Sequence, residues 1–210
     1  MESQTQSLSP ERRETAAQVE RSLEILDAAV LTFAAHGYNQ TDVQEIADRV
    51  GVGKGTVYRH FGNKEALFLA AVAHARDKLI AAVDAAKETE TDPFLEMRAC
   101  ITGILRFFDD HPEIVELIIE ERALFRDRRP SLFFEHEEKR KAEWAERLQT
   151  LIDSGTIRPI PVAEIQDTLS RFVFGTMFFN HFEGQSKEPL AERSQTMIDV
   201  LFNGLFVKKS

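Results

Sequence analysis

Residues 41–67 read TDVQEIADRVGVGKGTVYRHFGNKEAL, and this stretch decides the fold. Thr41 and Gln44 form a capping-box pattern, which predicts that a short helix begins here. Its inner face has apolar side chains at helical spacing, and Gly51 ends it; these side chains are Val43, Ile46, Ala47 and Val50. A turn over residues 50–53 leads to a second short helix, expected over about residues 54–61. Two helices joined by a short turn that contains glycine predict a helix-turn-helix.

Longer helices are expected on both sides of this motif. The preceding helix should end at Gly37 and has one apolar face, formed by Leu26, Ala29, Val30, Phe33 and Ala34. Asn63 is placed to cap the following helix, whose inner face contains Leu67, Ala70, Ala71 and Ala75. Residues 1–18 are polar and contain Pro10, so we expect a flexible tail. Arg12 and Arg13 would allow that tail to reach a minor groove, although a solvated tail is the favoured interpretation.

The distribution of charge is more informative than its sum. The net charge of −9 by itself disfavours non-specific binding to nucleic acid, which requires Lys and Arg against phosphate. Residues 49–64, however, contain Arg49, Lys54, Arg59 and Lys64 and no acidic residue. A local basic patch of this kind is the electrostatic footprint of a DNA-binding face, so double-stranded DNA is the expected partner.

The segment from Ile46 to Leu67 resembles the DNA-binding domain of the TetR family of bacterial transcriptional regulators. The glycine-containing turn, Tyr58-x-His60-Phe61 and Lys64-Glu65-x-Leu67 carry the resemblance, together with the turn over residues 33–38 and Thr41. It covers about residues 21–75, and beyond residue 80 it extends only to general architecture. It implies an all-α fold, with a three-helix DNA-binding domain over residues 19–79 and a larger helical domain for effector binding and dimerisation over residues 80–210.

The second short helix of the motif carries most of the candidate contacts to DNA. Glycines at its start would let the backbone approach the bases, and the neighbouring polar side chains can reach bases or phosphates. In the TetR family, the positions that match Tyr58, His60 and Lys64 contact the DNA backbone, and those that match Lys54, Gly55 and Thr56 lie nearest the bases. The full candidate set is Thr41, Gly53, Lys54, Gly55, Thr56, Tyr58, Arg59, His60 and Lys64.

Alternatives remain at several of these positions. Tyr58 could be a half-buried aromatic residue, and Lys64 an ordinary solvated charge. The sequence departs from the family at Gly53, where Ser or Thr is common. The helix cap loses little stability by this change, but any contact from that hydroxyl to a phosphate is lost.

The remainder of the chain is expected to contain about five helices, separated by Pro and Gly. Residues 165–182 are apolar nearly all round, so this helix should be buried on all sides. Leu190, Met197, Leu201 and Leu205 give the last helix a similar stripe. The resemblance implies a homodimer formed through these last two long helices; a thick monomer core is the alternative.

An apolar pocket between helices is the default ligand site in such a domain. The resemblance implies an apolar small-molecule effector of unknown identity, with Phe107, Phe125, Phe174, Phe178 and His181 as the candidate lining. Each of these residues is more often a core residue than a pocket residue. Glu116, Glu120 and Glu121 would favour a cationic ligand, but a solvated helix face is the favoured interpretation.

Other classes of function find little support. The segment Gly51–Thr56 resembles a phosphate-binding loop, but the upstream glycine and the preceding strand are missing. No nucleophile elbow or zinc-protease motif is present, and the lone Cys100 gives no disulfide and no metal-ligand spacing. We therefore expect no enzymatic activity, cofactor or metal. Because no signal peptide or membrane span is evident, we expect a cytoplasmic protein.

The favoured function is a sequence-specific transcriptional regulator, a repressor that a small-molecule effector releases from its operator. A helical scaffold that has lost DNA binding is the main alternative. It is disfavoured because such a protein should have lost the basic residues of the window 49–64.

Overall fold

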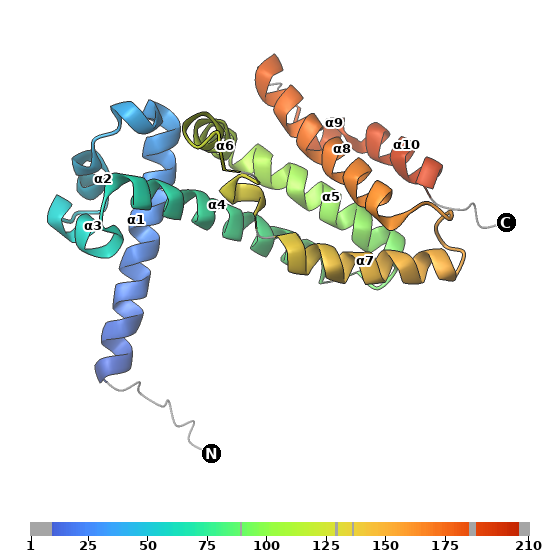
Figure 1. The fold of residues 1–210 in the computed structure, drawn as a ribbon, viewed down its shortest axis with the longest axis horizontal. Coiled ribbons are helices and arrows are strands. Elements are labelled where there is room, and N and C mark those ends of the chain that lie inside the picture. Colours follow the sequence, from blue (N-terminus) through green and yellow to red (C-terminus); the bar gives the residue numbers. More distant parts are fainter. Residues whose placement is uncertain (1–9, 89, 129, 136, 185–187, 206–210) are drawn as a thin grey trace. The chain divides into compact units, whose positions relative to one another are not determined.

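The computed structural model describes residues 10–88, 90–128, 130–135, 137–184 and 188–205. The regular elements of these residues are helices, which confirms the all-α prediction (Figure 1). The chain divides into two compact units, Met1–His74 and Ala75–Ser210. The boundary falls inside the long helix α4 (Lys64–Lys87), so this helix contributes its first turns to one unit and its remainder to the other.

The N-terminal unit contains α1 (Pro10–Gln40), α2 (Val43–Arg49), α3 (Lys54–Phe61) and the beginning of α4. α2 packs against α1 and against α3. The centre of this unit is apolar and fully buried, with Ile25, Ala29, Phe33, Ile46, Val57, Leu67 and Phe68 among its members. The rings of Phe33 and Phe68 meet edge to face at 5.1 Å between centroids, an arrangement that adds to the burial energy.

The N-terminal helix differs in length from the sequence prediction. α1 begins at Pro10, so the predicted tail is wrong over residues 10–18, and residues 1–9 lie outside the described part. Proline is favoured at the first position of a helix, and the Glu, Arg, Gln and Ala residues that follow are good helix formers. The predicted break at Gly37 is confirmed, because this residue has φ 71° and interrupts the helical geometry of α1.

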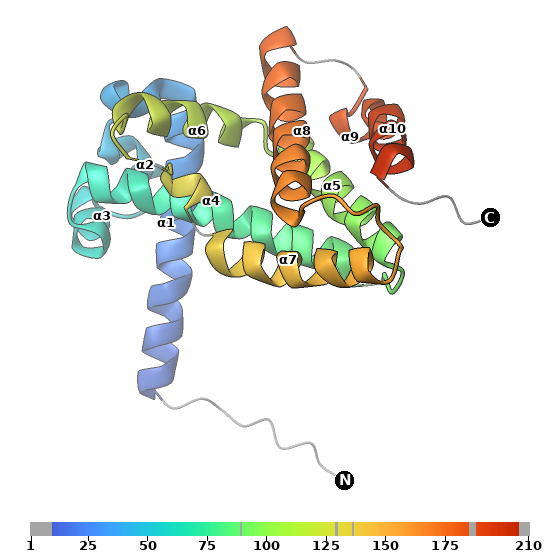
Figure 2. The same cartoon turned by 45° about the vertical axis from the view of Figure 1, so that its right-hand side comes forward.

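The C-terminal unit contains the rest of α4 and seven further elements. They are α5 (Pro93–Asp110), α6 (Glu113–Leu124), the 3-10 helix η1 (Leu132–Phe134), α7 (Glu137–Asp153), α8 (Val162–Glu183), α9 (Leu190–Arg193) and α10 (Gln195–Leu205). The two views agree that α7 runs alongside the C-terminal part of α4 (Figures 1 and 2). The predicted breaks fall between elements, but the expected last helix is two helices, α9 and α10, that meet at Ser194.

Apolar packing and a few polar contacts hold the C-terminal unit together. Its core joins α5, α7, α8, α9 and α10 through side chains that include Leu105, Leu148, Ile165, Ile198 and Phe202. Asp109 of α5 accepts hydrogen bonds from the backbone N–H groups of Leu190 (2.7 Å) and Ala191 (3.0 Å). These bonds satisfy free donors at the start of α9, where Pro189 offers no side-chain cap.

Among the described residues, no helix combines the length and the apolar character that crossing a membrane requires.

Candidate nucleic-acid interface and internal cavity

α3 is anchored by one buried side chain, and its other residues are partly or fully exposed. Val57 is its only buried residue and is fully inaccessible. Gly53 is the N-cap, with extended backbone and no side-chain cap, as the sequence suggested for a position that lacks Ser or Thr. A Cβ atom added to Gly53 or to Gly55 would meet nothing within 4 Å. The start of α3 is therefore a bare stretch of backbone that another molecule can approach closely.

Lys54 forms an ion pair across the motif. Its Nζ lies 2.7 Å from Oδ1 of Asp42, which is the N-cap residue of α2. The hydrogen bond from Lys54, together with one from the backbone N–H of Gln44, lowers the pKa of Asp42 below its ordinary value. The same bond to Asp42 raises the pKa of Lys54. Both side chains are largely exposed, so the pair is screened by solvent and can open.

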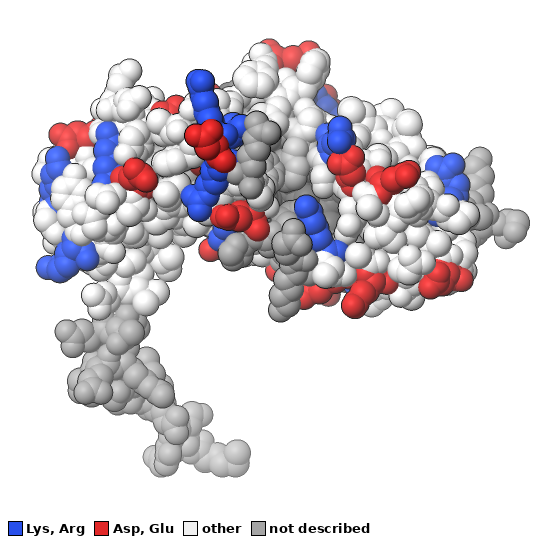
Figure 3. Space-filling model, viewed as in Figure 1, with Lys and Arg blue, Asp and Glu red and all other residues white. Residues whose placement is uncertain are grey.

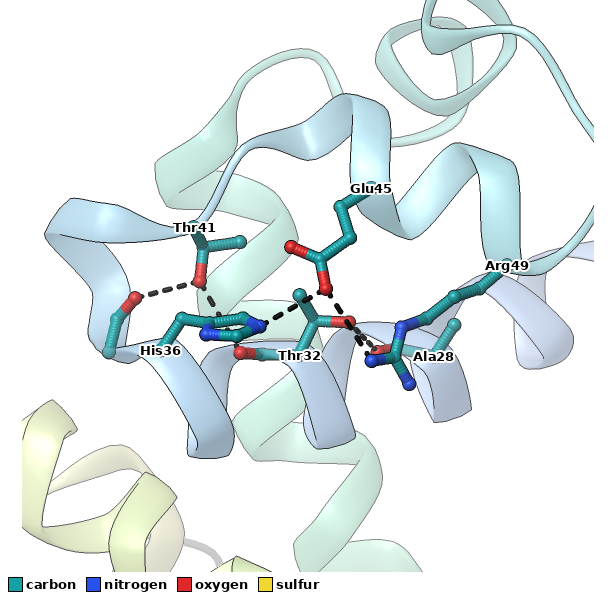
Figure 4. Close-up of polar contacts among 7 residues, drawn as sticks. Ala28, Thr32, His36, Thr41, Glu45 and Arg49 are labelled. Carbon is teal, nitrogen blue, oxygen red and sulfur yellow. Dashed lines mark hydrogen bonds and ion pairs between the residues drawn. The ribbon is translucent and has the colours of Figure 1, made fainter.

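Asp42, and not Thr41, is therefore the residue that caps α2. The prediction that Thr41 caps this helix is wrong, because the Asp42 side chain accepts the bond from Gln44 N. Thr41 is buried, and its hydroxyl donates to the carbonyl oxygen of Gly37 at 2.7 Å, with the Thr32 carbonyl also nearby (Figure 4). Its side chain closes the turn that follows Gly37 and is not exposed toward a DNA surface.

Lys64 lies at the start of α4, where its ammonium group has two neighbours. It donates to the carbonyl oxygen of Asn39 at 3.3 Å and lies 4.9 Å from the centre of the Tyr38 ring. Burial raises the pKa of Tyr38, with a smaller contribution from Glu65. The face of its aromatic ring attracts the Lys64 cation. Asn63 caps α4 through a 2.8 Å bond from Ala66 N, which confirms the predicted cap.

The remaining candidates on α3 differ in their exposure and contacts. His60 shares a 2.9 Å hydrogen bond between Nδ1 and the hydroxyl of Ser22 on α1, which fixes the orientation of its ring. Tyr58 and Thr56 are half-buried, and Arg59 is exposed. Within the described part of the chain, Arg59 has no ion pair. α3 thus collects Lys54, Gly55, Thr56, Tyr58, Arg59 and His60 on one short helix.

The basic window is partly neutralised in three dimensions. Arg49 lies 3.5 Å from Glu45, which also bonds to His36 at 3.1 Å (Figure 4). Lys54 is paired with Asp42, as described above. Both acidic residues come from the start of α2, before the window begins. Figure 3 accordingly shows Lys and Arg interspersed with Asp and Glu over α2 and α3 rather than a continuous basic surface.

The C-terminal unit contains an apolar cavity of about 190 Å³ between α4, α5, α7 and α8. Most of its lining is aliphatic, with Trp144 and Phe174 as the aromatic members and Lys141, Gln166 and Ser170 as polar ones. The described residues of the lining are Leu79, Ile80, Val83, Met97, Cys100, Ile101, Ile104, Lys141, Trp144, Leu148, Gln166, Leu169, Ser170, Val173 and Phe174.

Only Phe174 of the five residues predicted for an effector pocket lines this cavity. Phe107 is buried and packs against Phe108 and His111. Phe125 is the C-cap residue of α6, and the ring of Phe178 stacks on that of Phe182. His181 bonds to Glu116 at 2.9 Å. Apolar periodicity shows which faces of helices are turned inward, but it does not show where the packing leaves space.

One acidic residue of α6 also differs from expectation. Glu121 is fully buried, and its Oε1 accepts a 2.8 Å bond from the backbone N–H of Leu132. It therefore joins α6 to η1 and is not part of a solvated face.

A model of the family described as bacterial regulatory proteins, tetR family, matches residues 25–71. The matched segment contains the end of α1, all of α2 and α3, and the start of α4. The chain belongs to the TetR family. This family consists of transcription regulators and not of enzymes.

Curated transcription regulators match parts of the chain. The transcriptional activator FasR of Mycolicibacterium smegmatis is 36% identical over 101 residues, which cover 48% of this chain and 46% of FasR. The transcriptional repressor AcnR of Corynebacterium efficiens is 40% identical over 68 residues, which cover 32% of this chain and 31% of AcnR. The chain thus spans less than half the length of these two relatives.

The likeness of fold extends beyond residues 25–71, the segment that the family model matches. The structure of a fatty acid degradation regulator, FadR of Bacillus halodurans, matches with a TM-score of 0.72 over 93% of this chain and 96% of that one. At 17% identity, this likeness establishes the helical TetR-type fold.

Proposed function

We propose that this TetR-family protein is a homodimeric, sequence-specific repressor that binds double-stranded operator DNA and is released by a small-molecule effector. The observation that carries the proposal is the form of α3, which is anchored by Val57 and has open space over Gly53 and Gly55. A recognition helix enters the major groove with its N-terminal residues near the base edges. A bare glycine backbone at that end permits the required approach.

The side chains around this glycine backbone would contact different parts of the DNA. Lys54, Gly55 and Thr56 belong to the turn nearest the bases, where Lys54 would leave Asp42 to reach guanine or phosphate. Tyr58, His60 and Lys64 would contact the DNA backbone, and Arg59 would read a base or bind phosphate. Gly53 contributes a close backbone approach. Thr41 is omitted from this contact set because its side chain is buried.

Exposed apolar side chains on α8 and α10 support the dimer. Phe179 and Phe182 on α8 are 66% and 73% exposed, and Val200 on α10 is 69% exposed. Apolar surface of this kind, outside the core of its own subunit, is typical of an interface between proteins. Gly175 and Gly204 have open space beside them on the same two helices, which would allow a second subunit to approach closely. A thick monomer core would have buried these side chains.

The cavity of the C-terminal unit is the proposed effector site. Leu79, Ile80 and Val83 of α4 belong to its lining, and the same unbroken helix begins at Lys64 in the N-terminal unit. A ligand that moves α4 would therefore change the position of a DNA-contacting residue through a single helix. A coupling free energy of about 1–3 kcal/mol between the two sites suffices for such regulation.

Repression is proposed as the direction of regulation. The relatives include both a repressor and an activator, so family membership alone leaves the direction open. A dimer bound at a promoter blocks polymerase without further contacts, whereas activation requires an additional surface for polymerase.

Fluorescence anisotropy against labelled DNA from upstream of the protein's own gene tests the proposal. Unlabelled DNA of scrambled sequence serves as the competitor, and the titration is repeated at several salt concentrations. We expect sequence-selective binding. A plot of log affinity against log salt concentration should have a slope of about −0.9 for each phosphate contact. If this DNA is not bound, genomic fragments are selected on the immobilised protein; if that selection enriches no sequence, the proposal is rejected.

A further inference from the structure

The cavity of the C-terminal unit has a polarity that indicates the class of its ligand. Its floor is buried and apolar, with Met97, Ile101 and Val173 among the residues that form it. Lys141 and Ser170 are exposed members of the same lining and therefore lie at its rim. The site is thus apolar inside and polar at one edge, where α7 and α8 meet.

Among the described residues that line the cavity, Lys141 is the only charged one, and no described acidic residue of the lining compensates its positive charge. Gln166 donates from Nε2 to the backbone oxygen of Lys141 at 2.9 Å, which ties α8 to α7 at this edge of the cavity. The carboxamide oxygen of Gln166 and the hydroxyl of Ser170 complete the rim. A cation and a hydroxyl donor above an apolar floor suit a carboxylate that is attached to a hydrocarbon body.

We propose that this cavity selects an anionic amphiphile, a small carboxylic acid with an apolar body, whose carboxylate is bound by Lys141. The inference rests on the proposed effector role of this cavity and specifies the chemistry of its ligand. The apolar body fills the space above Met97, Ile101 and Val173. Lys141 and Ser170 donate to the carboxylate, and an amine in the same position would meet the charge of Lys141 instead.

Trp144 offers a direct measurement, because it lines the cavity and is the only tryptophan of the chain. The full-length protein is titrated with octanoate, octanol and octylamine while the fluorescence of Trp144 is recorded. We expect octanoate to bind about tenfold more tightly than octanol, since charge-assisted hydrogen bonds are roughly twice as strong as neutral ones. Octylamine should bind more weakly than either.

Lys141→Met should remove the preference for octanoate and leave the affinity for octanol unchanged. Lys87→Met is the matched control, because Lys87 pairs with Asp84 at 2.7 Å and does not line the cavity. Equal affinities for octanoate and octanol, or a preference that survives in Lys141→Met, would overturn the inference. So would the absence of any fluorescence change with all three probes.

DNA binding is measured separately with the same protein, so the two proposals can fail independently. Selective DNA binding without a preference for octanoate would reject the ligand class and leave the regulator intact. A Lys141-dependent preference for octanoate without any DNA binding would support the ligand class and reject the regulator.

Discussion

The glycines at the start of α3 and the glycine in the middle of α5 have different surroundings. In the N-terminal unit, Gly53 and Gly55 have no atoms near the place where a Cβ would lie. In the C-terminal unit, a Cβ on Gly103 would lie 2.9 Å from the Cβ of Ala86, so α5 and α4 pack in contact there. Gly53 and Gly55 thus leave space that a molecule outside the chain can use, whereas Gly103 makes room for a neighbouring helix inside its own unit. Substitutions can therefore separate binding from stability.

Breaking the proposed dimer should have the largest effect. Phe179→Asp combined with Val200→Asp places charges on the exposed faces of α8 and α10. We expect a monomer on size-exclusion chromatography with light scattering. Operator affinity in anisotropy should fall at least about a hundredfold, because the second half-site no longer binds within the same complex.

Leu95→Asp is the control for this double variant. Leu95 is 46% exposed on α5 of the same unit, so its replacement also adds a charge to an exposed apolar position. It should remain dimeric with unchanged operator affinity. If Leu95→Asp also produced monomers, or if the double variant remained a dimer, α8 and α10 would not be the interface.

Gly55→Leu should have the next largest effect. The free protein has room for the new side chain, so its melting temperature should remain close to that of the wild type. In the complex, the added side chain would occupy the space through which α3 approaches the bases. We expect operator affinity to fall by about tenfold to a hundredfold, a cost of about 1.4 kcal/mol for each factor of ten.

Gly103→Ala provides the reverse result. The added methyl group would meet Ala86 inside the C-terminal unit, and overpacking of this kind typically costs about 1–3 kcal/mol of unfolding free energy. Urea denaturation should detect this loss, while operator affinity of the folded protein stays near the wild-type value. Equal melting temperatures for the wild type and Gly103→Ala, or a destabilised Gly55→Leu, would contradict the distinction between the two units.

Lys64→Ala tests the proposed phosphate contact at the start of α4. The variant should bind operator several-fold more weakly, and the slope of log affinity against log salt should become shallower by about 0.9, as expected for one lost phosphate contact. Lys87→Ala, at the other end of the same helix, loses the same charge and should change neither quantity. An unchanged slope in Lys64→Ala would assign Lys64 to its contacts with Asn39 and Tyr38 only.

The two units also differ in how far the sequence predicts them. In the N-terminal unit, local signals mark most element ends: Gly37, Gly51 and Asn63 mark turns and caps, and Ile46 and Leu67 are buried as expected. The sequence did not reveal the ion pair between Asp42 and Lys54. Counting charges over residues 49–64 considers only residues that are close in the sequence, and Asp42 lies outside that window. Both partners lie at helix starts, which was the one available signal.

In the C-terminal unit, most helices and the breaks between them were predicted, but four of the five residues expected around an effector do not line the cavity. Phe107 and Phe174 are equally apolar in the sequence, yet one fills the core and the other lines the cavity. Which of them borders a space depends on how α4, α5, α7 and α8 pack together. That packing is set by contacts between residues far apart in the chain, which no local pattern records.

The smallest effect concerns the ion pair that occupies Lys54 in the free protein. Asp42→Asn preserves the cap of α2, because Asn and Asp cap almost equally well, and it removes the carboxylate that holds Lys54. The pKa of Asp42 is lowered in the folded protein, so the ion pair is fully formed above the unfolded-state pKa near 3.9 and is lost as the pH falls through the folded-state pKa. At neutral pH, the wild type therefore has the complete ion pair and Asp42→Asn has none. We expect operator affinity to rise a few-fold, with a steeper salt dependence. Asp48→Asn, which removes an exposed charge bonded to Gln44 on the same helix, should produce a smaller rise. Equal gains from both variants would show that general charge, and not release of Lys54, limits binding.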